Sequence, residues 1–164
     1  MARAPRYHGL TPSSARASEA ARGSSRKAGT KPELLLRRAL WRKGFRYRKN
    51  RADLPGAPDI VFRAARVIVF VDGDFWHGKN WKTLKAKLSQ EHNAEYWIRK
   101  IERNAARDWE QSRELSAGGW LVLRVWESDV HSNVGEVVRR VKSALEKQAY
   151  LWAPPVLQGR DLAD

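Results

Sequence analysis

A cluster of chemically reactive side chains follows the most apolar stretch of the chain. Residues 67–71 are Val-Ile-Val-Phe-Val, a run typical of a strand that is buried on both faces. Directly after it come two acids, two aromatic rings and a histidine: Asp72, Asp74, Phe75, Trp76 and His77. A hydrophobic core has no use for this set of side chains at one end of a strand. The pattern is typical of a site that binds a metal ion and inserts aromatic rings into a flat partner.

Another acid lies at the start of a second expected strand. Asp59 opens the apolar stretch 59–62, which a short turn connects to residues 67–71. Strands joined by a tight turn are antiparallel neighbours, so the start of one lies beside the end of the next. We therefore expect Asp59 near Asp72, where carboxylates and backbone carbonyls would suit a hard cation such as Mg²⁺. The alternative is that both acids are ordinary turn residues at strand ends.

Four further side chains have both a chemical and a structural interpretation. Because histidine ordinarily titrates near neutral pH, His77 could act as a general base on water, or it could be a surface or supporting histidine. Phe75 and Trp76 could stack on bases or wedge between them, or they could pack in the core. Glu33 follows Thr30 by three residues, as in a capping box, and it also lies in a first helical turn, whose N–H groups attract phosphate.

The first half of the chain predicts one helix and three strands. The helix is expected over residues 30–43, with Leu36 and Leu40 on its buried face and a glycine at its end. Alternating and apolar runs predict the strands, over residues 45–48, 59–62 and 67–71.

The second half predicts two helices around one strand. Residues 78–93 are polar and predict no regular element, whereas a long apolar stripe predicts a helix over residues 94–117. A strand is expected over residues 120–126, and the last helix is marked by Val134, Val138, Val141 and Leu145. The order helix, three strands, helix, strand, helix predicts an α/β fold: a mixed β-sheet flanked by helices on both faces.

Composition narrows the class of partner. The 164 residues suggest one domain, and 32 Lys and Arg against 18 Asp and Glu give a net charge of +14. This excess favours a polyanionic partner, most often nucleic acid, although a generally basic protein is the alternative. Cysteine is absent, which excludes disulfides and thiolate zinc sites. The sequence shows neither a long apolar membrane span nor a secretory signal, so we expect a cytoplasmic protein.

The chain divides into three regions by composition. Residues 1–29 are rich in Ser, Ala, Gly and Arg and predict a basic, flexible arm, with a short helix around residues 13–22. Residues 30–152 hold all the other expected elements and form the predicted domain. Residues 153–164 predict a tail without a clear element.

The motifs together resemble those of the very short patch repair (Vsr-type) DNA mismatch endonucleases, a branch of the PD-(D/E)XK restriction-endonuclease-like superfamily. The resemblance covers about residues 25–130. It rests on the order and spacing of TKPE at 30–33, GFRYR at 44–48, LPGAPDI at 54–60, VFVDGDFWH at 69–77, YW at 96–97, KI at 100–101, Asn104, RD at 107–108, GW at 119–120 and VWE at 125–127.

The resemblance implies a magnesium-dependent endonuclease that nicks one strand of double-stranded DNA at a T:G mismatch. Asp59 falls on the metal-binding aspartate of the family, and Val71 falls where a backbone carbonyl binds the metal. His77 falls on the proposed general base, and Glu33 falls on a helix glutamate that supports the site. Asp72 stands where the family commonly has a second histidine, so its catalytic role is open.

The resemblance also implies a surface that contacts DNA. Phe75, Trp76 and Trp97 fall on the aromatic residues that wedge into DNA at the mismatch. Asn104 belongs to the same group of expected DNA-binding residues. We expect double-stranded DNA as the partner and a monomeric protein.

One departure from the family concerns zinc. Better-studied members carry a structural zinc, whose ligand positions appear here as Asp74, Lys79, Trp81 and Ser128. None of these offers a thiolate, so the sequence predicts no structural zinc. Packing by Trp81 or a polar contact from Asp74 would take over the structural role of the zinc ion.

Three functions remain open from the sequence. The first is a nicking enzyme of mismatch repair. The second is a nickase of the same fold that acts in restriction or phage defence with little mismatch preference. The third is a DNA-binding protein whose catalysis has decayed, against which the intact Glu33, Asp59 and His77 argue.

Overall fold

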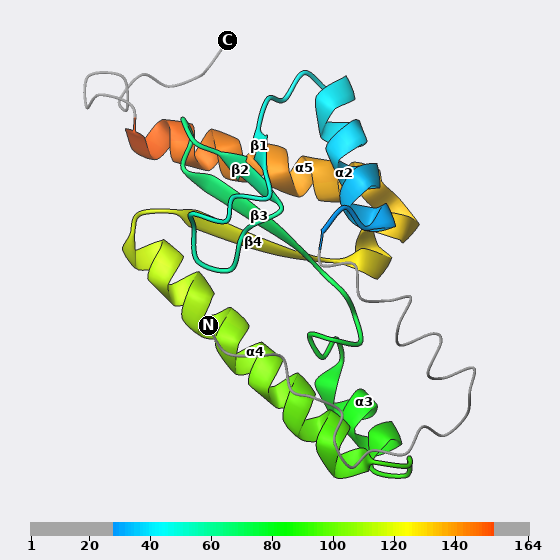
Figure 1. Ribbon diagram of the computed structural model, residues 1–164. Helices are drawn as coiled ribbons and strands as arrows, with labels where there is room; N and C mark the ends of the chain where they lie inside the picture. The colour runs from blue at the N-terminus through cyan, green and yellow to red at the C-terminus, as the bar shows by residue number, and fades with distance from the viewer. Residues whose placement is uncertain (1–27, 153–164) are drawn as a thin grey trace.

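A four-stranded sheet forms the centre of the molecule (Figure 1). The computed structural model describes residues 28–152, so the arm with its expected helix around residues 13–22 and the tail 153–164 lie outside the described residues. The strands lie side by side in chain order: β1 (Arg48–Lys49), β2 (Ile60–Phe62), β3 (Val67–Asp72) and β4 (Leu121–Trp126). The first three are antiparallel, and β4 is parallel to β3, which makes the sheet mixed as predicted.

The parallel pair determines where the reactive residues lie. Val67 pairs with Leu121 at one end, and Asp72 pairs with Trp126 at the other. Both strands therefore end at the same edge of the sheet. The residues after β3 and the first residues after β4 meet at that edge, although more than 50 residues separate Asp72 from Trp126 in the chain.

Helices cover both faces of the sheet (Figure 1). One face packs against α2 and α5, and the other faces α4; a short helix, α3, lies beside α4. Their bounds are α2 Lys31–Arg42, α3 Trp81–Leu88, α4 Ala94–Ala117 and α5 Glu127–Trp152. None of the helices within residues 28–152 combines the length and apolar character that a membrane span requires. The expected restriction-endonuclease-like α/β layout is thus present.

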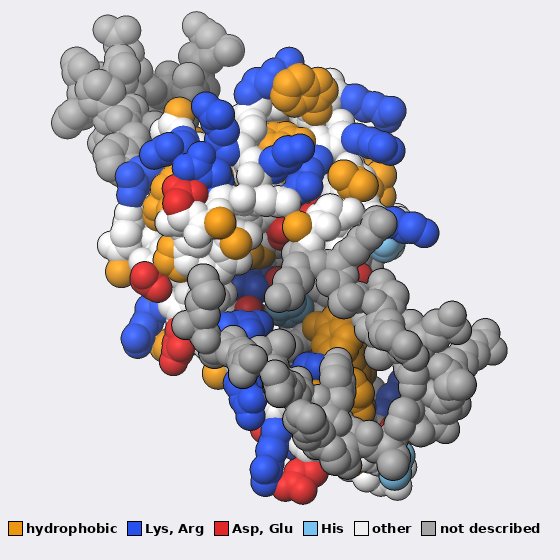
Figure 2. Space-filling model, viewed as in Figure 1, with side chains coloured by type: hydrophobic (Ala, Val, Ile, Leu, Met, Phe, Trp, Pro, Cys, Tyr) orange, Lys and Arg blue, Asp and Glu red, His pale blue; other side chains and the backbone are white. Residues whose placement is uncertain are grey.

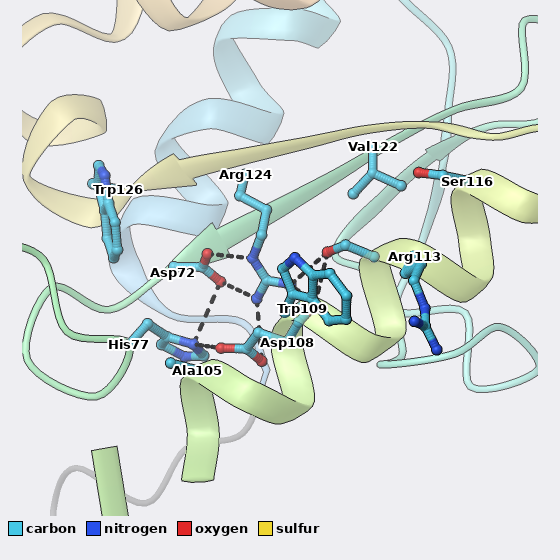
Figure 3. A pocket seen from close by; sticks show the side chains of 11 residues that line it. Asp72, His77, Ala105, Asp108, Trp109, Arg113, Ser116, Val122, Arg124 and Trp126 are labelled. Carbon is cyan, nitrogen blue, oxygen red and sulfur yellow. Dashed lines mark hydrogen bonds and ion pairs between the residues drawn. The ribbon is translucent and has the colours of Figure 1, made fainter. Parts of the chain in front are cut away.

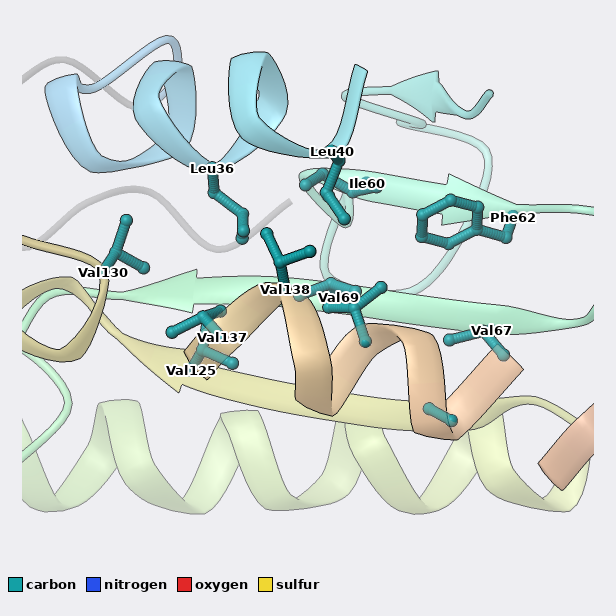
Figure 4. Packing of buried hydrophobic residues seen from close by; sticks show 12 residues of the cluster. Leu36, Leu40, Ile60, Phe62, Val67, Val69, Val125, Val130, Val137 and Val138 are labelled. Carbon is teal, nitrogen blue, oxygen red and sulfur yellow. The ribbon is translucent and has the colours of Figure 1, made fainter. Parts of the chain in front are cut away.

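The core has two layers because β3 is buried on both faces. Val67 and Val69 join the larger cluster with Leu36 and Leu40 of α2 and with valines of α5 (Figure 4). On the other face, Ile68 and Phe70 pack with Val61 of β2 and Leu115 of α4. The unbroken apolar run of the sequence is explained by this double burial.

Most predicted elements are confirmed, but the first strand is shorter than expected. Phe45 and Tyr47 pack edge-on against Phe62, with ring centroids 6.4 and 5.9 Å away, and lie outside the ladder. Only Arg48 and Lys49 pair with β2, which is itself three residues long.

The prediction of no regular element over residues 78–93 is wrong. Helix α3 occupies Trp81–Leu88, and Leu88 is buried. Asn80 and Asn93 stand in the left-handed region at the N-caps of α3 and α4, with φ of 53° and 63°, where asparagine is tolerated better than most residues. The apolar positions Trp81, Leu84 and Leu88 have helical spacing, which the polar residues between them concealed.

The predicted capping box is also wrong in detail. Thr30 is the N-cap of α2, but its side chain caps no backbone N–H group. Its hydroxyl donates instead to Oε1 of Glu33 at 2.9 Å, and the N–H of Gly29 donates to Oε2 at 2.8 Å. Glu33 therefore fastens the chain that enters α2.

Candidate active site

The start of β2 and the end of β3 bring Asp59 to the backbone of Val71. Oδ2 of Asp59 accepts a hydrogen bond of 2.8 Å from the N–H of Val71. Burial raises the pKa of Asp59 to about 6, and this hydrogen bond offsets the effect only in part. The charges of Glu33 and Asp72 raise the pKa further, while Arg37 lowers it. A carboxylate removed from water among other acids is a favourable place for a cation.

Arg37 of α2 connects Glu33 to Asp59. The Nη2 group of Arg37 donates to the carbonyl oxygen of Asp59 at 3.0 Å and lies 3.2 Å from Oε2 of Glu33. Glu33 and Arg37 are both buried. Because both oxygens of Glu33 already have partners, this residue lies beside the site and holds its surroundings in place.

His77 is hydrogen-bonded to a carboxylate of α4. Its Nδ1 atom lies 2.5 Å from Oδ2 of Asp108, which is buried. Burial alone would raise the pKa of Asp108, but the hydrogen bond from His77 and the charge of Arg124 outweigh it and lower the pKa. Asp108 is therefore ionised at neutral pH and can only accept from the ring. A neutral imidazole that donates from Nδ1 has its lone pair on Nε2.

Arg124 of β4 joins two carboxylates that flank the imidazole (Figure 3). Its Nε and Nη2 atoms bind the two oxygens of Asp72 at 2.6 and 2.7 Å, and Nη2 lies 3.3 Å from Oδ1 of Asp108. Oδ1 of Asp72 lies 3.8 Å from Nδ1 of His77. We call Asp72, His77, Asp108 and Arg124 the His77 network.

The network determines what Asp72 can do. Asp72 is buried, and both of its oxygens are occupied by Arg124. Burial would lower the pKa of Arg124, but its hydrogen bonds to Asp72 and the charges of Asp72 and Asp108 raise it. Two negative charges and one positive charge thus surround His77.

The His77 network forms one end of a pocket between α4 and β4. The pocket has a volume of about 720 Å³ and continues along α4 past Trp109 and Arg113 to Ser116 (Figure 3). Asp59 lies outside its lining.

The expected DNA-binding residues form a second cluster, at the surface. The ring of Phe75 lies 5.1 Å from that of Trp76 and 5.9 Å from that of Trp97, and the two tryptophan rings are 5.9 Å apart. Asn104 donates from Nδ2 to the carbonyl oxygen of Trp76 at 3.0 Å and so holds the loop that carries it. The Nζ atom of Lys100 lies 5.0 Å from the Trp76 ring centroid. None of these rings belongs to the two buried clusters. We call Phe75, Trp76 and Trp97 the aromatic cluster.

Three of the four positions expected to correspond to zinc ligands, Asp74, Lys79 and Ser128, are held here by polar contacts. Lys79 donates to Oγ of Ser128 at 2.5 Å and to Oδ1 of Asp129 at 2.7 Å. Asp74 accepts from the N–H of Ser128 at 3.4 Å, and its own N–H donates to Glu127 at 3.0 Å. These contacts fasten the loop after β3 to the start of α5. Within residues 28–152, no group of three or more His, Cys, Asp or Glu could hold a metal ion.

Sequence reasoning missed two members of the His77 network. Arg124 is the single charge within the expected strand 120–126, and an isolated charge in an apolar strand signals a buried partner. Asp108 lies on the same stripe of α4 as Trp97 and Ile101, so a carboxylate interrupts an inward-facing stripe. Neither pattern, however, identifies the residue that the charged side chain contacts.

A mixed sheet between helices, with an acid and a histidine at one edge, is the layout of restriction-endonuclease-like nucleases. The family model described as DNA mismatch endonuclease Vsr matches residues 12–83. The type II nicking enzyme V.NmeDIP of Neisseria meningitidis serogroup C is 48% identical over 122 residues, which cover 74% of this chain and 81% of the relative. The chain belongs to the Vsr family of DNA endonucleases.

Two other relatives define the range of the similarity. The type II nicking enzyme V.HpaIIP of Haemophilus parainfluenzae is 40% identical over 124 residues, 76% of this chain and 86% of the relative. The DNA mismatch endonuclease Vsr of Escherichia coli strain K12 is 36% identical over 95 residues, 58% of this chain and 59% of the relative. The resemblance found in the sequence is thereby confirmed.

Proposed function

We propose that this endonuclease nicks one strand of double-stranded DNA at T:G mismatches and requires Mg²⁺. The observation that carries the proposal is the position of three groups at one sheet edge. Asp59 offers a carboxylate for a cation, and the His77–Asp108 pair offers a base. Two rings of the aromatic cluster, Phe75 and Trp76, lie on the loop that carries His77.

The surroundings of Asp59 fit a magnesium ion. One oxygen of Asp59 is held by the N–H of Val71, and no hydrogen bond within the described residues reaches the other oxygen. Magnesium is commonly held by one or two carboxylates together with water, so Asp59 and the carbonyl of Val71 suffice as protein ligands. When bound, the ion would neutralise phosphate charge and acidify a water molecule.

His77 is placed to accept a proton from the attacking water. Its bond to Asp108 leaves Nε2 as the basic nitrogen and keeps the ring in one orientation. The carboxylate of Asp108 also stabilises the imidazolium that forms when the proton arrives. Asp72 supports this arrangement through Arg124, and Glu33 supports Asp59 through Arg37. We therefore assign positioning roles to Asp72 and Glu33.

The aromatic cluster supports a preference for mismatched DNA. Rings that wedge between bases must unstack them, and unstacking costs less at a mispaired step. Lys and Arg side chains are numerous on the visible face (Figure 2), which suits a phosphate-lined partner. We propose double-stranded DNA as the partner of a cytoplasmic, monomeric enzyme that has no structural zinc.

A second function is favoured by the names of the relatives. V.NmeDIP and V.HpaIIP are described as type II nicking enzymes, and the zinc-ligand positions hold Asp74, Lys79, Trp81 and Ser128 in this chain. A nickase associated with restriction or phage defence, with little mismatch preference, is therefore the alternative.

One assay separates the two functions. End-labelled duplexes that differ only in one T:G or matched pair are incubated with the full chain in Mg²⁺ or in EDTA. We expect a nick in one strand of the T:G duplex with Mg²⁺ and none in EDTA. Equal nicking of T:G and matched duplexes would support the alternative, and nicking in EDTA would contradict the metal requirement.

A further inference from the structure

Trp109 is an exposed aromatic side chain directly beside the His77 network. It follows Asp108 in α4, and 63% of its surface is exposed, more than that of the other exposed large hydrophobic residues in residues 28–152. Its indole lies in the pocket that begins at His77, between α4 and β4 (Figure 3). An exposed indole face beside His77 offers a flat surface on which a base can stack.

The pocket has the size and lining of a site for one flat, anionic group. Its volume of about 720 Å³ falls in the range of small-ligand sites. Apolar atoms of Ala105 and Val122 line it together with the Trp109 ring. Its charged side chains are Asp72, Asp108, Arg124 and Arg113. Arg124 is paired with both acids, which leaves Arg113 as the cation outside the His77 network.

Arg113 is the cation that a ligand can use. Its guanidinium carbon lies 5.0 Å from the centroid of the Trp109 ring, and within the described residues it takes part in no ion pair. The guanidinium lies over one face of the indole, so a base would stack on the opposite face while Arg113 binds its phosphate.

From the His77–Asp108 pair the pocket extends along α4 toward Ser116, away from the aromatic cluster. Trp97 precedes Trp109 by twelve residues in α4, which places them about 18 Å apart along the helix axis. Asp108, which is hydrogen-bonded to His77, directly precedes Trp109 in α4 and is therefore much closer to Trp109 than to Trp97. DNA that contacts the aromatic cluster and is cut beside His77 would therefore continue past Trp109.

We propose that this pocket binds one nucleotide of the substrate DNA, on the side of the nick away from the aromatic cluster. The base leaves the duplex stack and lies on the Trp109 ring, and its phosphate pairs with Arg113. The site would hold the cut strand at a second point beside His77. This inference rests on the DNA-nicking activity and needs neither T:G preference nor a particular metal ion.

Base removal from the substrate tests the contact directly. The duplex that the full chain nicks fastest is prepared with one abasic nucleotide at each position within five steps of the nick. Nicking rates and affinities, the latter in EDTA, are measured for wild type, Trp109→Ala, Trp109→Phe, Arg113→Gln and Trp41→Ala. Trp41 is the matched control, because it is 55% exposed and stacked on Arg46 at 3.8 Å, on α2.

The proposal predicts coupling between one ring and one base. Trp109→Ala should weaken affinity for the intact duplex roughly tenfold, and Trp109→Phe should keep most of it. On the duplex that lacks the stacked base, wild type and Trp109→Ala should bind equally. Arg113→Gln should still weaken binding there, because the phosphate remains. Trp41→Ala should behave as wild type throughout.

Two outcomes would overturn the proposal. One is a Trp109→Ala affinity equal to that of wild type on the intact duplex. The other is a loss of equal size on every abasic duplex, because then no base depends on the ring. Both are visible in affinity measurements without nicking, so they are distinct from a failure of the T:G or Mg²⁺ assignments, which the nicking panel reports.

Discussion

Arg124 binds Asp72 through two parallel hydrogen bonds, of 2.6 and 2.7 Å, between neighbouring parallel strands. The pair places a guanidinium above the ring of Phe70, 4.6 Å from its centroid, and beside the carboxylate of Asp108. Asp72 is buried at this strand end, and Arg124 supplies the hydrogen bonds that satisfy both of its oxygens. The edge of the sheet that carries His77 thus depends on a charge from β4.

Removal of the Arg124 charge should destabilise the fold. Arg124→Met leaves Asp72 as a buried carboxylate without its partner, and we expect a loss of about 3 kcal/mol in the free energy of unfolding. The double variant Asp72→Asn, Arg124→Met should lose less than Arg124→Met alone, because residue 72 then carries no charge without its partner. Urea denaturation of four proteins, namely wild type, Asp72→Asn, Arg124→Met and the double variant, measures the coupling. Additive losses would mean that the two side chains are not coupled.

Asp59→Asn should abolish nicking and leave DNA binding nearly intact, because the carboxylate is the proposed magnesium ligand. Single-turnover nicking rates and DNA affinity in EDTA test both parts. Full activity of the purified variant would contradict the assignment of this residue.

Asp59 should also make stability depend on pH. Its pKa in the folded protein is raised to about 6 from an ordinary value of 3.8, so the fold binds this proton more tightly than the unfolded chain does. The contribution of the Asp59 proton to the free energy of unfolding is complete below pH 3.8 and is lost as pH rises through about 6. In a chelator, wild type should therefore lose stability relative to Asp59→Asn between these pH values. Thermal unfolding of both proteins at several pH values measures this difference in stability. Melting temperatures that change with pH in parallel for the two proteins would contradict the raised pKa.

Asp108→Asn should slow nicking by about 100-fold or more, because an amide no longer holds His77 in one tautomer. Affinity for DNA should change little. His77→Ala combined with Asp108→Asn should be no slower than His77→Ala alone if the two act as a unit. Rates that multiply in the double variant would show independent roles.

Trp76→Ala should lower both the nicking rate and the preference for T:G over matched duplexes. The ring belongs to the surface aromatic cluster, so the loss of unfolding free energy should stay well below the roughly 3–5 kcal/mol of a core substitution. Denaturation and nicking rates on both duplexes are compared. A large stability loss with an unchanged ratio of rates would identify Trp76 as a core residue.

The full chain should keep its thermal midpoint in a strong chelator without Mg²⁺, because Lys79 fastens the loop by polar contacts to Ser128 and Asp129. Lys79→Met should lower the midpoint by a few degrees in chelator and in buffer alike. Metal analysis of the purified protein provides the control. Stoichiometric zinc would refute the prediction.

Local patterns in the sequence predicted most elements but few of the pairings. The stripe of α4 and the double burial of β3 each depend on residues within one element, so periodicity was sufficient. Helix α3 was missed because its apolar positions are few and lysines separate them. The network around His77 could not be predicted, since Asp108 and Arg124 reach it from elements 31 and more residues away. The sequence shows that Arg124 is an unusual charge in an apolar strand, but only the fold shows that its partners are Asp72 and Asp108.

The contacts of Lys79 have a consequence for the conditions in which this enzyme can work. A loop fastened by zinc and thiolates is released when oxidants attack the sulfur atoms or when zinc is scarce. The ammonium group that joins Ser128 and Asp129 needs no metal supply, and the chain contains no cysteine for peroxide to oxidise. The loop that carries Phe75 and Trp76 should therefore stay in place when zinc is scarce and when oxidants are present.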